Sequence, residues 1–310
     1  MNRASPDSRA FAVLAALGVV WGASFVFIKV IVEDISAVEL ATARLTLGAI
    51  TVLGIVVVRR TRLAVTRRAL LELTGIALFA NVLPFVLIGW SEERIDSGVA
   101  SVLNATMPIF TACFAAFAFA DERFTVARAG GLVLGFAGTM VLVGEDVVRI
   151  TDSAVLAQLA VVLAGACYGA SSTYMRTLLE TYDAVALSAL QLTLGALLGW
   201  PILLAVDGTP AFGGMDVEAW LSLLALGIGG TGVGYVAYVW LIETTGSVRA
   251  SLVTYIIPVT GLLLGWLVLG EEVGLNVLAG AALIVGGVAL VLRPGSEVAA
   301  EGVVVRVGAD

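Results

Sequence analysis

Hydrophobic and polar positions follow one another along the chain in long blocks. Apolar runs of about 20 residues, enough for a helix to cross ~30 Å of hydrocarbon, are separated by short stretches that hold charges, Pro or Gly. We therefore predict an all-α integral membrane fold with ten transmembrane helices. The predicted spans are residues 11–32, 37–58, 69–90, 97–119, 126–143, 154–175, 184–206, 217–241, 249–270 and 275–292.

The pattern occurs twice. Residues 100–142 match residues 250–292 at a constant offset of 150, and the string RLTLGA that begins at Arg44 matches QLTLGA from Gln191. Each copy holds five predicted helices, an odd number, so the second copy must enter the membrane from the opposite side. We predict two inverted five-helix repeats, with the spans and tails divided as 1–10 (cytoplasmic N-terminal tail), 11–143 (first repeat), 154–292 (second repeat) and 293–310 (cytoplasmic C-terminal tail).

Composition supports a membrane protein and narrows the chemistry. The chain is 60% hydrophobic and 13% charged, whereas soluble domains carry roughly 25% charged residues. It has no histidine, so Ser-His and His-metal sites are unavailable, and its two cysteines lie within apolar runs. The pI of about 4.7 argues against nucleic-acid binding. We predict no cofactor, no metal site, no catalytic residue and no enzymatic activity.

Arginine placement predicts the orientation. Most arginines fall on the side shared by the two termini, and the opposite loops hold only Arg94 and Arg149. This bias predicts a multi-pass protein of the cell membrane with both termini cytoplasmic. Carboxylates such as Glu92 and Glu271 fall near the outer loops and are interpreted as a solvated acidic rim. No Asp or Glu is expected at mid-membrane, so proton coupling through a buried carboxylate is not predicted.

Three motifs carry a family resemblance. They are WGASFVFIK at residues 21–29, the run that ends in Pro108 before Asp121 and Glu122, and ASLVTYIIPVTGLLLGWLVLGEE at residues 250–272. Together they resemble the EamA-like branch of the drug/metabolite transporter superfamily over residues 11–292. The resemblance implies two copies of a five-helix unit and a carrier of small metabolites such as amino acids, often acting in export. Small four-helix relatives use a carboxylate in their first helix, which this chain lacks.

Aromatic and small polar side chains near mid-span are candidates for a substrate cavity between the repeats, because a polar group in hydrocarbon needs a partner. The predicted substrate-binding residues are Trp21, Ser24, Phe25, Lys29, Arg44, Asn81, Phe85, Asn104, Pro108, Tyr168, Ser171, Gln191, Tyr235, Tyr255 and Pro258.

The charged candidates each have alternatives. Lys29, the only lysine in the chain, could extend to the interface, capture a substrate carboxylate or phosphate, or form a salt bridge with Glu33. Arg44 lies deeper, where facing lipid would cost about 3 kcal/mol or more, so we expect it to face the protein or a wet cavity. Its partner is either a carboxylate of the chain or the substrate.

Proline and glycine suggest how the helices could move. Pro108 and Pro258 each free a carbonyl one turn earlier, near Asn104 and Thr254, which predicts either a static kink or an exposed polar backbone. Glycine pairs four apart in the helices at 11–32 and 154–175 predict close packing, or a sliding contact as a cavity opens.

The leading hypothesis is a secondary transporter that moves a small organic metabolite by alternating access. The alternative is a channel or passive pore for small solutes. A small-molecule substrate and the lipid bilayer are the expected partners, without nucleic acid. Substrate identity, direction of transport, coupling ion and oligomeric state stay open at this point.

Overall fold

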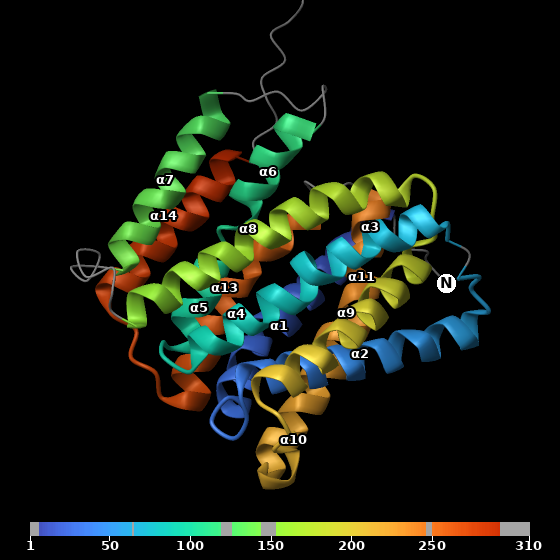
Figure 1. The fold of residues 1–310 in the computed structure, drawn as a ribbon. Helices are drawn as coiled ribbons and strands as arrows, with labels where there is room; N and C mark the ends of the chain where they lie inside the picture. The colour runs from blue at the N-terminus through green and yellow to red at the C-terminus, as the bar shows by residue number, and fades with distance from the viewer. Residues whose placement is uncertain (1–5, 64, 119–125, 144–152, 246–249, 292–310) are drawn as a thin grey trace, which may run out of the picture.

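The computed structural model describes residues 6–63, 65–118, 126–143, 153–245 and 250–291. Within these ranges the chain is all-helical, without strands (Figure 1). The helices are α1 (Pro6–Ile31), α2 (Ala37–Arg59), α3 (Arg67–Ala77), η1 (Leu78–Val82), α4 (Leu83–Glu92), α5 (Ser97–Asn104), α6 (Met107–Ala118), α7 (Val126–Val143), α8 (Ser153–Leu179), α9 (Ala184–Val206), η3 (Phe212–Gly214), α10 (Val217–Leu224), η4 (Ala225–Val233), α11 (Gly234–Thr245), η5 (Ser251–Tyr255), α13 (Ile256–Leu264), η6 (Gly265–Leu269) and α14 (Leu275–Val291).

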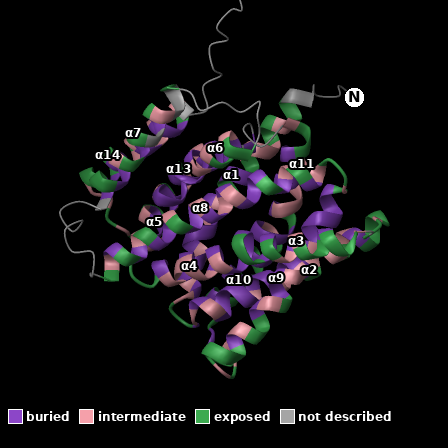
Figure 2. Cartoon of the chain, turned by 45° about the horizontal axis from the view of Figure 1, so that its top comes forward, coloured by how far each residue is buried: buried purple, intermediate pink, exposed green. Residues whose placement is uncertain are grey.

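Each predicted span falls on one helix or on a run of consecutive helices. In the described part, seven helices are long and apolar enough to cross a membrane, and three shorter apolar helices accompany them. Large apolar side chains are exposed on the outside, including Phe11, Val58, Phe117, Leu197 and Leu267. Figure 2 shows buried residues along the inward side of the helices. An apolar exterior of this extent suits hydrocarbon rather than water.

Side-chain caps fix where several helices begin. Ser36 starts α2 with a capping box, in which its hydroxyl accepts from Glu39 N and the Glu39 carboxylate accepts from Ser36 N. Asp183 and Asp216 accept backbone amides at the starts of α9 and α10. These caps satisfy amides that have no intrahelical partner.

Proline and π-helical turns interrupt the helices near the centre of the molecule. α5 ends at Asn104 and α6 begins at Met107, because Pro108 has no N–H to bond the Asn104 carbonyl. The matching segment before Pro258 is the 3₁₀ turn η5, followed by α13. The π-helices η1 and η4 occupy matching positions of the two repeats. Such irregular turns are frequent at functional sites.

Glycines bring the two repeats together. A Cβ placed on Gly22 of α1 would lie 2.5 Å from Thr260 Cβ of α13, and one on Gly169 of α8 would lie 2.7 Å from Thr111 N of α6. Each glycine therefore lets its helix approach a helix of the other repeat. The glycines of α1 thus pack against α13 and those of α8 against α6, which agrees with the predicted close packing.

α7 and α14 form a separate pair at one side of the molecule (Figure 1). Gly138 faces the Gly280 carbonyl and Gly287 faces the Gly131 carbonyl, so the two helices touch through backbone. The other long helices surround a central space, where the candidate site lies.

Candidate functional site

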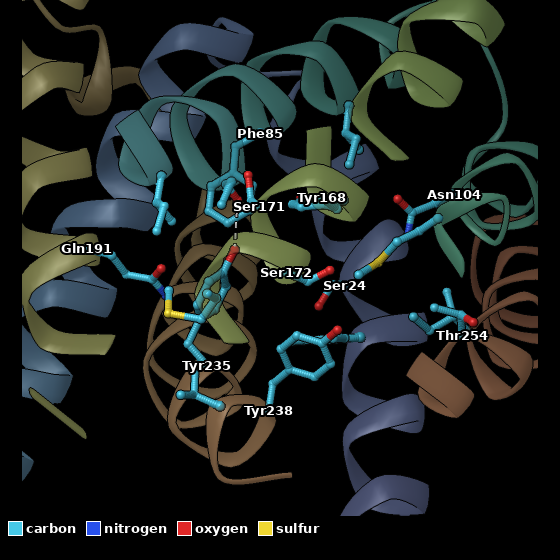
Figure 3. Close-up of a pocket in the computed structure, with 18 of the residues that line it drawn as sticks. Ser24, Phe85, Asn104, Tyr168, Ser171, Ser172, Gln191, Tyr235, Tyr238 and Thr254 are labelled. Carbon is cyan, nitrogen blue, oxygen red and sulfur yellow. Dashed lines mark hydrogen bonds between the residues drawn. The ribbon is translucent and has the colours of Figure 1, made fainter. Parts of the chain in front are cut away.

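A central cavity of about 100 Å³ lies between helices of both repeats (Figure 3). Its walls come from α1, α2, the α3–η1–α4 run, α5, α6, α8, α9, α11, η5 and α13. Ten predicted residues line it: Trp21, Ser24, Phe25, Arg44, Phe85, Asn104, Tyr168, Ser171, Gln191 and Tyr235. In Figure 3, Gln191 and Tyr235 lie at one side and Asn104 and Thr254 at the other. The structure thus brings together side chains, such as Trp21 and Tyr235, that are more than two hundred residues apart in the sequence.

Residues that match by repeat line the cavity in pairs. Trp21 and Tyr168 both line it, as do Phe85 and Tyr235. The remaining matched pairs on the wall are Ser24/Ser171, Phe25/Ser172, Ile28/Met175, Arg44/Gln191, Ile88/Tyr238, Asn104/Thr254 and Met107/Ile257. The cavity is therefore built from equivalent helix faces of the two repeats.

Arg44 supplies a positive charge to the cavity. Its side chain is 7% exposed, and its Nε donates to Thr231 Oγ1 at 2.7 Å. Its guanidinium lies over the Phe85 ring, 3.8 Å from the centroid. Among the described residues no carboxylate lies within 4.0 Å of it, so no ion pair neutralises the charge there. The structure does not show the predicted pairing with a carboxylate of the chain.

Two buried amides on the cavity wall have an oxygen that accepts no hydrogen bond from the described residues. They are Gln191 Oε1 on α9 and Asn104 Oδ1 on α5. A buried polar atom without a partner costs free energy, so such atoms call for water or a ligand. Both oxygens can accept from an N–H or O–H donor in the cavity.

Aromatic rings form much of the remaining wall. Trp21 packs against Tyr238 with 5.0 Å between ring centroids and against Tyr235 at 6.3 Å. Trp21 Nε1 donates to the Gly230 carbonyl of η4, and the Tyr235 hydroxyl donates to the Ala80 carbonyl of η1. These carbonyls match by repeat, so each π-helix is tied to a cavity aromatic of the opposite repeat.

Two charged side chains hold the turn between α4 and α5, which begins one helical turn beyond the cavity residue Ile88. Lys29 Nζ donates to the carbonyls of Glu92 at 2.6 Å and Ile95 at 3.0 Å. The Glu271 carboxylate accepts from the amides of Ser97 at 2.7 Å and Gly98 at 2.9 Å. Lys29 thus binds the carbonyl of the last α4 residue and one in the turn, and Glu271 binds the first amides of α5, where a helix favours negative charge. Neither of these charged groups lines the cavity.

The burial of Glu92 contradicts the prediction that it belongs to a solvated acidic rim. Its side chain is 0% exposed, and both carboxylate oxygens lack a hydrogen-bond partner among the described residues. The rim interpretation holds for the exposed Glu33, Glu93 and Glu272 but is wrong for Glu92. The helix end that contains Glu92 is covered by α1, α2 and α8, which the sequence pattern alone does not show.

Comparison with known proteins identifies the family. Residues 9–144 and 155–293 each match the EamA-like transporter family.

The chain belongs to the EamA-like transporter family.

Relatives of this EamA-like protein are named as transporters. An uncharacterized transporter, YoaV, of Bacillus subtilis (strain 168) is 27% identical over 89% of this chain and 94% of its own length. A probable terminal-alkyne amino-acid exporter of Streptantibioticus cattleyicolor is 28% identical, over 92% and 94% of the two chains. An uncharacterized inner membrane transporter, YedA, of Escherichia coli (strain K12) is 26% identical over 82% and 81%. The chain is thus a multi-pass membrane transporter.

A crystal structure in the comparison shares the fold. It superposes with a TM-score of 0.66 at 22% identity, covering 92% of this chain and 97% of the other. At this identity the similarity establishes the fold alone.

Five predicted site residues of this EamA-like chain lie off the cavity wall. Asn81 is fully buried and neither of its amide atoms has a described partner, but it belongs to η1 behind the wall. Lys29 holds the α4–α5 turn, so it neither pairs with Glu33 nor reaches the cavity. Pro108 and Pro258 break helices beside the cavity, and Tyr255 packs in a small apolar cluster.

The apolar residues of the cavity wall are absent from the site residues predicted from sequence. These residues are Ile28, Ile76, Ala80, Ile88, Met107, Met175, Val239, Ile242 and Ile257. Helical spacing held a signal for some of them, because Ile28 follows Ser24 by four residues and Met175 follows Ser171 by four. In a chain this hydrophobic, polarity alone cannot separate an apolar wall from a face that contacts lipid.

Proposed function

We propose that the chain is a secondary carrier that moves a small, amino-acid-like solute by alternating access. In this proposal ten spans form two inverted five-helix repeats, both termini are cytoplasmic, and the solute binds in the central cavity. In this mechanism one binding site is open first to one side of the membrane and then to the other. Inverted repeats can exchange conformations, which provides the two states.

The observation that carries the proposal is the pairing of the cavity wall. Matched positions such as Phe85 and Tyr235 line one common space, and the glycine contacts of α1 and α8 cross between the repeats. A binding site shared by two matched halves is the arrangement expected of such a carrier.

The substrate class follows from the charges and rings of the wall. Arg44 carries an unneutralised guanidinium, which binds a carboxylate well. Trp21 and Tyr238 offer aromatic faces to an ammonium group. Apolar side chains such as Ile28 and Met175 complete the wall. Carboxylate, ammonium and an apolar side chain together describe an amino acid, and one relative is named as a probable amino-acid exporter.

Counterflow in proteoliposomes tests the proposal. Vesicles that contain the purified chain are loaded with an unlabelled amino acid and diluted into a trace of the same labelled compound, over a panel of proteinogenic and terminal-alkyne amino acids. A carrier gives a transient overshoot of label and a rate that saturates with concentration. Flux that rises linearly without an overshoot, or single-channel current steps in a planar bilayer, would support the channel alternative instead.

A further inference from the structure

Glu92 is an ionisable group that the proposed substrate site does not use. It ends α4, one helical turn beyond Ile88, which lines the cavity. Its side chain is 0% exposed and its carboxylate oxygens have no hydrogen-bond partner among the described residues. An ionised carboxylate in this condition is strongly disfavoured, so the arrangement favours the protonated form.

The charged groups around Glu92 come from several elements. Lys29 of α1 and Arg44 of α2 favour its anion, and Glu271, which follows η6, disfavours it. No ion pair within 4.0 Å joins Glu92 to either cation in the described residues, and Lys29 is occupied by backbone carbonyls. Four further ionisable sites lie on the neighbouring elements. Asp96 precedes α5, and Glu93 and Arg94 form an exposed ion pair. Glu39 of α2 accepts from the amides of Ser36 and Ala211, and Tyr168 of α8 lines the cavity.

The position of Glu92 connects it to the closure of one cavity end. Lys29 binds the carbonyl of Glu92 itself and that of Ile95, and Glu271 binds the first amides of α5. If Glu92 loses its proton, relief of the buried charge requires that Lys29 leave these carbonyls for the carboxylate or that water enter. Either change loosens the α4–α5 turn.

The matching position in the second repeat has no such group. The residue that matches Glu92 is Ile242, which lines the cavity. Ile242 shows that an apolar side chain can occupy the matching position of the fold. The asymmetry points to chemistry that belongs to the α4–α5 end.

We propose that Glu92 is a proton-binding site whose occupancy holds the α4–α5 end of the cavity closed, so that proton binding and release accompany each transport cycle. The proposal rests on the carrier function above. One proton binds a carboxylate oxygen of Glu92 when this end closes, and the same proton leaves when the carboxylate is next exposed to water. No other covalent bond changes in the cycle, and the only hydrogen bonds that have to change are those of Lys29.

Thiol labelling tests the proposal without a known substrate. Ile88→Cys, in a chain that also carries Cys113→Ala and Cys167→Ala, is reacted with a membrane-impermeant maleimide in right-side-out and inside-out vesicles between pH 5 and 9. The rate is divided by that of Glu33→Cys, an exposed position at the same end, which cancels the titration of the thiol. The ratio should rise by up to roughly tenfold per pH unit over the range in which Glu92 titrates.

Two variants separate proton binding from a packing role. With Glu92→Gln, a neutral side chain of the same size, the ratio should stay low and independent of pH, whereas the matched control Glu93→Gln should keep the parent profile. Lys29→Met removes the cation that favours the Glu92 anion and also the hydrogen bonds to the Glu92 and Ile95 carbonyls. It should therefore raise the ratio at low pH and move the midpoint of the remaining pH-dependent rise to higher pH. A purely structural role of Glu92 would not produce such a shift.

The outcomes are distinct from those of the carrier test. A parent ratio that does not change with pH, or a Glu92→Gln ratio that follows the parent profile, would overturn the proton site even where counterflow is intact. Missing counterflow together with the expected pH profile would reject the carrier proposal and leave Glu92 as a proton-binding group. Size-exclusion profiles of the purified variants establish that each is folded.

Discussion

The two repeats line the cavity with residues at matching positions, but the two sets of residues differ in charge. Trp21 and Tyr168 occupy equivalent places, yet Arg44 in the first repeat stands against Gln191 in the second, and Glu92 stands against Ile242. Both repeats therefore supply the helices that enclose the site, while the first repeat alone supplies the guanidinium of Arg44 on the wall and the buried carboxyl of Glu92 near it. Duplication accounts for the architecture, and departures from the duplicated sequence account for the chemistry.

The largest effect is expected when Arg44 is replaced, the charged member of the repeat-matched positions Arg44 and Gln191. Charge-assisted hydrogen bonds contribute about 1.5–3 kcal/mol, so Arg44→Gln should weaken the affinity for a transported amino acid by roughly 10- to 100-fold. Gln191→Leu removes a neutral partner and should cost roughly 2- to 10-fold. Competition against labelled substrate in proteoliposomes measures both. Equal losses in the two variants would show that the charge asymmetry is irrelevant to binding.

The next effect concerns the charged contacts at the α4–α5 end. Glu271 accepts two backbone amides at the start of α5, and Glu271→Gln removes the charge from both bonds. We expect the labelling rate of the thiol introduced by Ile88→Cys to rise roughly tenfold, because charge-assisted bonds are about twice as strong as neutral ones. Glu272→Gln, at the exposed neighbouring residue, is the matched control. An unchanged rate with Glu271→Gln would mean that this carboxylate does not hold the turn.

Glycine contacts between the repeats can be tested symmetrically. Gly22→Ala and Gly169→Ala each place a Cβ within 3 Å of the opposite repeat, so each should lower the free energy of unfolding by about 1–3 kcal/mol. Gly54→Ala meets nothing within 4 Å and should be neutral or stabilising. Thermal unfolding in detergent compares the three variants. Our assignment of the crossing contacts fails if Gly22→Ala behaves like Gly54→Ala.

The smallest effect is expected at Asp96. Partial desolvation of the carboxyl and the nearby Glu271 charge raise the pKa of Asp96, although its side chain is exposed, so the folded chain keeps this proton to a higher pH than the unfolded chain. The ionised form therefore costs stability above the raised pKa, and this cost disappears as the pH falls below the ordinary value. Asp96→Asn should raise the unfolding midpoint by less than about 2 °C at pH 7 and leave it unchanged at acidic pH. A midpoint that drops at pH 7 would contradict this sign.

Much of the helical order could be predicted because it depends on local sequence. Apolar runs of the right length and the prolines at 108 and 258 each act within a few residues. The polar and aromatic part of the cavity could also be predicted, since such side chains need partners inside a membrane protein. The repeat offset then indicated which of these residues would meet.

The positions that sequence could not place depend on tertiary packing. Glu92 sits at the end of an apolar run, where exposure is the ordinary expectation, and only the covering helices α1, α2 and α8 bury it. Lys29 binds carbonyls more than sixty residues away in the sequence, a contact that no local pattern encodes. The π-helices η1 and η4 are stabilised by Trp21 and Tyr235 from elsewhere in the chain.

Reciprocal labelling of the matched residues Ile28 and Met175 tests the central claim most directly. Each is replaced by cysteine in the chain with Cys113→Ala and Cys167→Ala, and an impermeant maleimide is applied from either face of the membrane, with and without a transported amino acid. Alternating access predicts that the two thiols are reached from opposite faces, and that conditions which speed one labelling rate slow the other. Simultaneous labelling of both thiols from the same face, at rates that rise and fall together, would contradict the carrier and indicate an open pore.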